Sequence, residues 1–397
     1  MSFTRTSLLA SCACVALALA ACSTQPIAPG SIKPPLTPPT PVVPPIAKPA
    51  EILRLTSYAA LPGWDKDELR DAWPAFLASC EVMVNKADWR EPCTIAREVD
   101  ASDGKAVRTF FESFFAPYQV FNPDGSETGL ATGYYEPLLH GARKRGGRYQ
   151  IALHRVPDDL LTVDLAGVYP ELKSMRLRGR QVGNKIVPYP SREQMSQSNL
   201  LAGKELLWVD DAIDAFFLQV QGSGRVQLAD SKETVRVAYA DQNGYPYKSI
   251  GRYLVDKGEL KLEQASAQGI KAWLVANPAR QQELLNANPS YVFFKEEKLP
   301  DPKKGPKGAL GVALTAQRSI AVDPQYVPLG VPVFLSSTQP ASEVPLQRLV
   351  MAQDTGGAIK NAVRADYFWG FGAEAGDKAG RMKQRAMMWV LLPKSGA

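Results

Sequence analysis

Histidine is scarce in this chain, with only His140 and His154 among 397 residues. So few imidazoles, neither of them near the acidic clusters, exclude the common zinc hydrolase sites. The GxSxG turn of serine hydrolases, the Walker phosphate loop and the GxGxxG dinucleotide fingerprint are also missing. Gly222-Ser223-Gly224 lacks the spacing for a phosphate loop and is predicted to be a turn that exposes backbone amides. The sequence therefore predicts no metal and no cofactor, and it disfavours serine catalysis through Ser223.

The apolar segment near the N-terminus is too short for a transmembrane span. It follows Arg5, the only charged residue before Cys22, and ends in Leu19-Ala20-Ala21-Cys22. This pattern resembles a bacterial lipoprotein signal. The resemblance implies removal of residues 1–21 and acylation of Cys22 with fatty acids such as palmitate. With Ser23 next, it implies an outer-membrane lipoprotein that faces the periplasm of a Gram-negative bacterium. The alternative is a plain secretory signal with an incidental cysteine.

Cysteine is scarce as well, with five in the chain, and Cys12 and Cys14 would leave with the signal. Cys80 and Cys93 would remain in a compartment that permits disulfides. They either close a short loop or stay as two free buried thiols, because the sequence gives no distance between their Cα atoms.

Neither sign of charge dominates. The formal net charge is +6, and the basic residues are spread along the chain rather than clustered in blocks. Nucleic acid is therefore not predicted as a partner, and an acidic cell-wall polymer fits this mild excess as well. A hydrophobic content of 45% with 22% charged residues indicates a globular chain of about two domains.

The order of segments predicts a mainly β protein with accessory helices. Residues 22–50 are rich in proline and are predicted to form an extended linker. A β-domain over 122–255 is predicted to be inserted into a second domain built from 51–121 and 256–397. A capping box at Asp65-Lys66-Asp67-Glu68 is predicted to open the first helix. Helices are expected over 69–77, 106–115, 250–257 and 262–277, with a helical piece around 191–193. Strands are expected over 128–136, 148–153, 185–189, 214–221, 225–228, 235–239, 291–294, 311–314, 319–322, 331–335, 349–352 and 387–392.

Three aspartates are the candidate chemical groups. Asp354 ends the apolar run at 349–352 and precedes two glycines, and Asp366 stands before Tyr367-Phe368-Trp369. Asp323 likewise follows an apolar segment. A carboxyl group among aromatic rings is poorly hydrated, which favours the neutral form that a general acid requires. Paired carboxylates are the usual equipment of a glycosidase. The alternative is that the aspartates are turn or cap residues and that the rings are core.

Several polar and aromatic residues suit a sugar groove, because aromatic rings stack on sugar faces and amides bind hydroxyl groups. Each of them could instead be ordinary strand packing. The predicted substrate-binding residues are Thr132, Tyr134, Gln219, Gln221, Gly222, Ser223, Asp323 and Trp369, with Tyr135 and Phe371 nearby.

Five motifs between about 128 and 392 resemble one known family. They are Thr132-Gly133-Tyr134-Tyr135-Glu136-Pro137, Val220-Gln221-Gly222-Ser223-Gly224, Tyr247-Lys248-Ser249-Ile250-Gly251, Asn288-Pro289-Ser290-Tyr291-Val292-Phe293-Phe294 and the C-terminal segment with the aspartates. The chain is identified by them as similar to the membrane-bound lytic murein transglycosylase A family. That resemblance implies a six-stranded double-psi β-barrel that holds the aspartates, a second β-barrel domain, and a groove between them.

The resemblance also implies an activity and roles for the aspartates. The family cleaves the MurNAc–GlcNAc β-1,4 bond of peptidoglycan and forms 1,6-anhydro-MurNAc without water or metal. By position, Asp366 matches the catalytic acid and base, and Asp354 is expected to orient it or to raise its proton affinity. Asp323 is expected mainly to shape its loop. The implied partners are peptidoglycan glycan strands, the outer membrane and cell-wall synthase complexes.

Two other classes stay open on the sequence alone. A wall-binding lipoprotein on the same fold would hold the polymer intact, and a conventional muramidase would use water and release reducing ends. The products of turnover discriminate among the three.

Overall fold

The structure is a computed structural model that describes residues 52–299 and 301–394. The predicted signal at 1–21, the lipidation residue Cys22 and the linker at 22–50 lie outside the described residues. Among the residues described, none of the helices is both long and apolar enough to cross a membrane.

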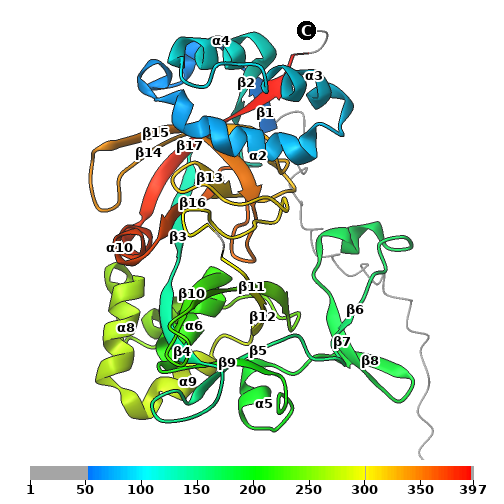
Figure 1. The fold of residues 1–397 in the computed structure, drawn as a ribbon, viewed down its shortest axis with the longest axis vertical. Helices are drawn as coiled ribbons and strands as arrows, with labels where there is room; N and C mark the ends of the chain where they lie inside the picture. Colours follow the sequence, from blue (N-terminus) through cyan, green and yellow to red (C-terminus); the bar gives the residue numbers. More distant parts are fainter. Residues whose placement is uncertain (1–51, 300, 395–397) are drawn as a thin grey trace, which may run out of the picture. The chain divides into compact units, whose positions relative to one another are not determined.

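The first domain is a closed β-barrel (Figure 1). Its ladder runs β17-β14-β15-β13-β16-β3, and β3 pairs again with β17, which closes the ring. The strands are β3 (Gly129–Glu136), β13 (Ser319–Ala321), β14 (Pro332–Thr338), β15 (Pro345–Asp354), β16 (Arg364–Phe371) and β17 (Lys383–Pro393). The pairs β13–β15 and β3–β16 are parallel and the others are antiparallel. The short strands β1 (Leu53–Leu55) and β2 (Phe115–Val120) extend the sheet beyond β17. The predicted mainly β fold with a six-stranded barrel is therefore confirmed.

Helices cover one end of this barrel. They are α2 (Trp73–Met83), α3 (Ala87–Ile95) and α4 (Gly104–Phe114), which gather around β1 and β2 at the top of Figure 1. Phe76 of α2 and Phe111 of α4 are fully buried and pack edge to face, with ring centroids 5.1 Å apart. A disulfide joins Cys80 of α2 to Cys93 of α3, so of the two predicted alternatives the structure has the closed loop. The aromatic stripes of these helices are core, as predicted.

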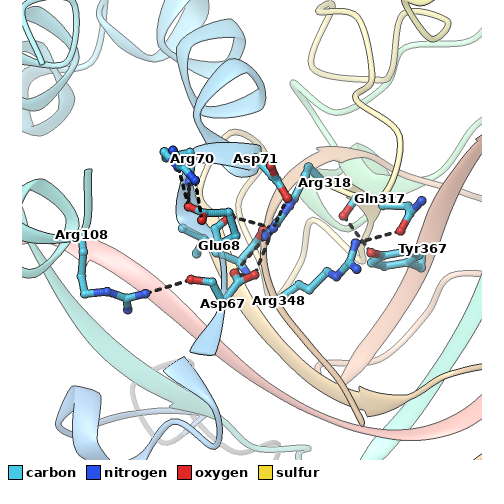
Figure 2. Close-up of polar contacts among 10 residues, drawn as sticks. Asp67, Glu68, Arg70, Asp71, Arg108, Gln317, Arg318, Arg348 and Tyr367 are labelled. Atoms are coloured by element: carbon cyan, nitrogen blue, oxygen red, sulfur yellow. Dashed lines mark hydrogen bonds and ion pairs between the residues drawn. The ribbon is translucent and has the colours of Figure 1, made fainter. Parts of the chain in front are cut away.

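The predicted capping box before the first helix is wrong. Glu68 caps a 3-10 turn, η3 (Leu69–Ala72), by accepting a hydrogen bond from the Arg70 backbone N–H. Asp67 instead turns inward and accepts hydrogen bonds from the Arg318 guanidinium at 2.9 and 3.0 Å (Figure 2). It also accepts one from the Leu349 N–H at 2.7 Å. Asp67 therefore ties the N-terminal helical segment to two barrel segments, and a local capping pattern could not reveal this long-range role.

The second sheet has the order β12-β11-β10-β4-β9-β5. Its strands are β4 (Leu138–Ala142), β5 (Ile151–His154), β9 (Glu205–Val209), β10 (Ser223–Leu228), β11 (Thr234–Gln242) and β12 (Val292–Glu297). Four helices share a separate apolar cluster beside it: α6 (Ala212–Gln221), α7 (Ile250–Asp256), α8 (Ala267–Ala276) and α9 (Gln281–Asn286). A small third sheet contains β6 (Leu161–Thr162), β7 (Arg178–Val182) and β8 (Lys185–Pro188). The remaining elements are α5 (Arg192–Ser196), α10 (Ala373–Arg381) and the 3-10 turns η1 (Tyr58–Ala60), η2 (Trp64–Lys66), η4 (Pro170–Ser174), η5 (Leu262–Gln264) and η6 (Pro278–Arg280).

Two predicted strands are wrong. The segment 214–221 belongs to helix α6, because the Asp211 carboxylate caps it by accepting from the N–H groups of Ile213 and Asp214. Gly222 ends this helix at φ 83, a conformation that glycine adopts without a steric penalty. Strand β10 therefore forms its hairpin with β11 and not with 214–221. The segment 311–314 lies in a loop with a single bridge from Ala313 to Lys307.

Two strands belong to a different sheet from the one that the predicted domain boundaries assign to them. Strand β3 falls within the predicted insert at 122–255, but it closes the barrel between β16 and β17. Strand β12 lies beyond that insert, but it pairs with β11 of the second sheet. Tertiary pairing decides both cases, and it is not visible in the local patterns from which the boundaries were drawn.

Candidate active site

One row of residues crosses four neighbouring barrel strands. Ala321 of β13 pairs with Asp354 of β15 on one side and with Asp366 of β16 on the other. Asp366 in turn pairs with Thr132 of β3. Neighbouring strands lie about 4.8 Å apart, so the Cα atoms of the two aspartates are separated by about 10 Å. The barrel therefore brings together residues from distant parts of the chain.

An irregularity in the ladder sets the position of Asp354. Ile320 pairs with Ala352, but the next residue, Ala321, pairs with Asp354, so Gln353 is an extra residue in β15. Gln353 is fully buried, and its amide donates hydrogen bonds to Ala75 O and Ser79 Oγ. Bulges of this kind re-aim the following side chain and are common next to active sites.

Asp366 is half-buried and its carboxylate has few donors. Its Oδ1 accepts a hydrogen bond of 2.5 Å from the Thr132 hydroxyl. That hydroxyl accepts one of 2.8 Å from Arg364 Nη2, which fixes the direction in which its own proton points. Within residues 52–299 and 301–394, no hydrogen bond reaches Asp366 Oδ2. Burial raises the pKa of Asp366, while the Arg364 cation and the Thr132 hydrogen bond oppose that rise.

Asp354 has a fuller set of donors. Its Oδ1 accepts hydrogen bonds from the backbone N–H groups of Ala309 at 3.0 Å and Thr355 at 2.9 Å. Its Oδ2 accepts one of 3.0 Å from the Tyr134 hydroxyl. Burial raises the pKa of Asp354, the three hydrogen bonds oppose the rise, and the nearby charge of Asp366 adds to it.

The two carboxyl groups are therefore suited to different tasks. Hydrogen bonds to a carboxylate stabilise its charged form, and Asp354 receives three such bonds where Asp366 receives one. Asp366 receives a single hydrogen bond and has one oxygen free of hydrogen bonds in the part of the chain described, which leaves that oxygen for proton transfer to or from a ligand.

An apolar cluster explains the poor hydration of both groups. It consists of Tyr134, Leu314, Ala321, Ile359 and Phe368, all nearly or fully buried. Tyr134 and Phe368 pack with ring centroids 5.2 Å apart, so the Tyr134 hydroxyl reaches Asp354 from a fixed ring. Low hydration disfavours the charged form of any nearby carboxyl group.

The barrel brings together four of the predicted site residues. Asp354, Asp366, Thr132 and Tyr134 are brought together, with the last two hydrogen-bonded to the two carboxyl groups. Tyr134 is only 8% exposed. The structure therefore gives both residues hydrogen bonds to the aspartates and leaves Tyr134 little surface for a sugar.

The other predicted residues lie elsewhere and are mostly buried. The Gln219 side chain accepts from Arg192 Nη2 at 2.7 Å, and that of Gln221 accepts from the Tyr135 N–H at 3.0 Å. Gly222 ends α6, and Ser223 begins β10 as a buried residue. Asp323 is 2% exposed and accepts from the N–H groups of Gln325 and Asn361, which agrees with a loop-shaping role. Trp369 is 4% exposed and its Nε1 contacts the sulfur of Met382, so the structure gives a stacking role for this ring no support.

Two charged residues next to the site were missed from the sequence. Arg364 stands two positions before Asp366 in the same strand, and side chains at that spacing lie on the same face. That spacing was a usable signal. Glu136, at the end of β3, is fully buried and forms ion pairs with Arg225 at 2.8 Å and Arg236 at 2.5 Å. These arginines belong to β10 and β11, so the triad joins β3 to the second sheet, and only the tertiary structure reveals it.

Family models match both domains. The model described as the MltA specific insert domain matches residues 130–295, and the one described as the 3D domain matches residues 318–392. A curated relative from Escherichia coli, named membrane-bound lytic murein transglycosylase A, is 33% identical over 293 residues, which is 70% of each chain. The chain belongs to the MltA family.

Solved structures agree with this membership. A Burkholderia pseudomallei lytic transglycosylase, LtgG, is 50% identical and matches with a TM-score of 0.58 over 86% of this chain and 96% of its own. MltA from Neisseria gonorrhoeae is 37% identical, with a TM-score of 0.74 over 87% and 93% of the two chains. MltA from Escherichia coli with bound chitohexaose is 26% identical, with a TM-score of 0.63 over 82% and 90%. The barrel with the row of aspartates is thus part of an MltA fold.

Proposed function

We propose that this MltA-family protein is a peptidoglycan lytic transglycosylase. It cleaves the MurNAc–GlcNAc β-1,4 bond and leaves a 1,6-anhydro-MurNAc end. The observation that carries this proposal is Asp366, a half-buried carboxyl group with a raised pKa and one oxygen free of hydrogen bonds in the described structure. The names of the relatives, and the chitohexaose bound to one of them, support a β-1,4-linked amino-sugar polymer as substrate.

In the first step Asp366 acts as an acid. Its proton passes to the glycosidic oxygen as the bond from that oxygen to C1 of MurNAc breaks. The carboxylate that forms keeps the Thr132 hydrogen bond and the nearby Arg364 cation, both of which stabilise its negative charge. The same two contacts therefore lower the barrier to proton release.

In the second step the same carboxylate acts as a base. It takes the proton of the MurNAc C6 hydroxyl while that oxygen bonds to C1, which closes the 1,6-anhydro ring and restores protonated Asp366. The nucleophile belongs to the substrate, so the step is intramolecular and has a high effective concentration. A second catalytic carboxylate is not required.

Asp354 supports this chemistry as a fixed charge. Its three hydrogen bonds, from Tyr134, Ala309 and Thr355, hold it in place and favour its ionised form. It is placed to stabilise the positive charge that develops on the sugar ring when the bond to C1 breaks. The expected direct orientation of Asp366 by Asp354 is replaced in this proposal by the contacts from Thr132 and Arg364.

Substrate binding and location belong to the same proposal. The glycan strand is assigned to a groove between the barrel and the second domain, and the bond from the Tyr135 N–H to Gln221 places the end of α6 beside β3 there. The Leu19-Ala20-Ala21-Cys22 motif and the membrane-bound relative support a lipid anchor at Cys22, with the protein on the outer membrane and facing the periplasm. Peptidoglycan turnover is the expected role, and synthase complexes stay a prediction from the resemblance.

Product analysis on purified sacculi tests the proposed activity. The full-length protein should release muropeptides that are lighter by one water than those from a muramidase digest of the same sacculi, because ring closure replaces hydrolysis. Products with only reducing ends would establish a conventional muramidase instead. Retention of the protein on intact sacculi without any soluble product would establish a wall-binding protein.

A further inference from the structure

A cavity of about 410 Å³ lies away from the aspartates, beside the small third sheet. It is lined by Arg180, Pro188, Pro190, Gln194, Ser198 and Leu200. Arg180 comes from β7, Pro188 ends β8, and Gln194 belongs to α5. None of these residues takes part in the aspartate site, so the proposed reaction leaves the cavity without a role.

The guanidinium of Arg180 forms no ion pair in the described part of the chain, although its charge acts on the nearby Tyr189 hydroxyl. Its Nε is buried without a hydrogen bond, and no carboxylate lies within ion-pair distance of the side chain among residues 52–299 and 301–394. Arg178, two positions earlier in the same strand, is paired with Asp241 at 2.9 Å. Arg180 is half-buried, and a buried donor such as its Nε is costly when it has no hydrogen bond. Arg180 therefore offers the cavity a positive charge that forms no ion pair in the described structure.

The remaining lining residues add donors and apolar walls. The Gln194 side-chain oxygen accepts from the Ser191 N–H, which leaves its amide hydrogens for the cavity. The Ser198 hydroxyl already donates to Met195 O, so it adds no free donor. Pro188 and Pro190 have no N–H, and Leu200 packs on the apolar cluster of Tyr189 and Met195. The lining contains no carboxylate, so its electrostatics favour an anion that carries a small apolar group.

We propose that this cavity binds a carboxylate of the peptide stems of peptidoglycan. A single planar guanidinium fits one carboxylate through two parallel hydrogen bonds, whereas a doubly charged phosphate group usually recruits more cations. The proline and leucine walls suit the short aliphatic side chains beside such a carboxylate. This inference rests on the proposed function, because that function brings peptide stems to the protein. It extends recognition from the glycan to the peptide.

Calorimetric titration of the full-length protein tests the inference with ligands that it does not cleave. The probes are a GlcNAc–MurNAc-tetrapeptide, the same muropeptide with its carboxylates converted to amides, the free tetrapeptide, and neutral chitohexaose. Wild type should bind the acidic muropeptide roughly tenfold more tightly than the amidated one, as expected for one lost charged pair. The Arg180→Gln variant should remove this preference and leave chitohexaose binding unchanged. Lys185→Gln, an exposed basic residue on the neighbouring strand, should behave as wild type.

Each outcome has a separate meaning. Equal affinity of wild type for the acidic and amidated muropeptides overturns the inference, and this arm needs no variant to fold. A preference that persists in Arg180→Gln overturns it too, because the carboxylate then binds elsewhere. Tight binding of the free tetrapeptide at Arg180 with no gain from the sugars would assign the site to free peptides rather than to stems. Failure of chitohexaose and both muropeptides to bind would contradict the proposed function itself.

Discussion

Asp354 and Asp366 show how the environment gives two identical side chains different tasks. Both have pKa values raised by burial. Asp354 receives three hydrogen bonds, two of them from backbone N–H groups whose positions the fold fixes. Asp366 receives one, from Thr132. In the proposed mechanism, this difference in donors underlies the assignment of Asp366 as the acid and Asp354 as the fixed charge.

Removal of the Arg364 cation should shift the pH dependence of the enzyme. Arg364 lowers the pKa of Asp366, so Arg364→Gln should raise that pKa further. The first step needs protonated Asp366, and its proton is lost as pH rises through its pKa. The alkaline limb of kcat/KM should therefore move to higher pH in Arg364→Gln, as measured by turnover of sacculi across a pH series.

The matched control for this shift is Arg385→Gln, which removes one positive charge from an exposed position on β17. Its profile should overlay that of wild type. An alkaline limb that stays in place in Arg364→Gln, or moves to lower pH, would show that Arg364 does not control the proton of Asp366.

At the scale of elements, β3 connects the two domains. Thr132 and Tyr134, two positions apart on β3, donate hydrogen bonds to Asp366 and Asp354 respectively. Glu136, at the end of the same strand, forms ion pairs with two arginines of the second sheet. A fully buried carboxylate between two guanidinium groups is stable only while all three partners stay in place. The strand therefore couples the position of the site to the position of the second sheet.

The helical segment before the barrel depends on a buried ion pair. Asp67 and Arg318 have side chains only 4% and 3% exposed. Asp67→Asn should lower the free energy of unfolding by about 3 kcal/mol, the lower end of the range for a broken buried pair, because the buried guanidinium keeps only the exposed Asp71 carboxylate, at 3.3 Å, as a counter-charge. Chemical denaturation of both proteins measures this difference.

Glu68→Gln is the neighbouring control. It breaks an ion pair with Arg70 in which both side chains are nearly half exposed, and such pairs contribute little (Figure 2). No resolvable change is expected. Equal losses in the two variants would mean that the Asp67 pair has no special structural role.

Local sequence patterns predicted the barrel well and the partners of the aspartates poorly. The runs at 331–335, 349–352 and 387–392 are apolar over lengths typical of buried strands, and they form β14, β15 and β17. The segment 214–221 failed because its cap, Asp211, lies outside the run that suggested a strand. Thr132 and Asp366 are 234 positions apart, so their hydrogen bond depends on barrel closure, which no local pattern encodes.

At the scale of the whole molecule, two links hold the helical segment that precedes the barrel: one is a disulfide and the other is a buried ion pair. The disulfide between Cys80 and Cys93 fixes α2 to α3, and Asp67 fixes the preceding turn to the barrel. Before this segment in the sequence, a proline-rich linker is predicted at 22–50, which lies outside the described residues.

The predicted anchor is tested by Cys22→Ala. Loss of acylation should move the protein from the membrane fraction to the soluble periplasmic fraction, with activity on isolated sacculi unchanged. Cys14→Ala, another cysteine of the same signal, should leave the protein in the membrane fraction. Persistence of Cys22→Ala in the membrane fraction after a salt wash would contradict the lipid anchor.

The most direct measurement of the central claim is turnover of sacculi by Asp366→Asn beside Asp354→Asn. Asparagine keeps the shape and can still accept the Thr132 hydrogen bond, but it can neither protonate the leaving oxygen nor accept the C6 proton. General acid–base catalysis contributes about 10² to 10⁴ in rate, and here one residue acts in both steps. Asp366→Asn should therefore lose activity at or beyond the upper end of that range, with its melting temperature and chitohexaose affinity retained. Near-wild-type turnover by Asp366→Asn, together with an inactive Asp354→Asn, would contradict the account and assign the catalytic proton to Asp354.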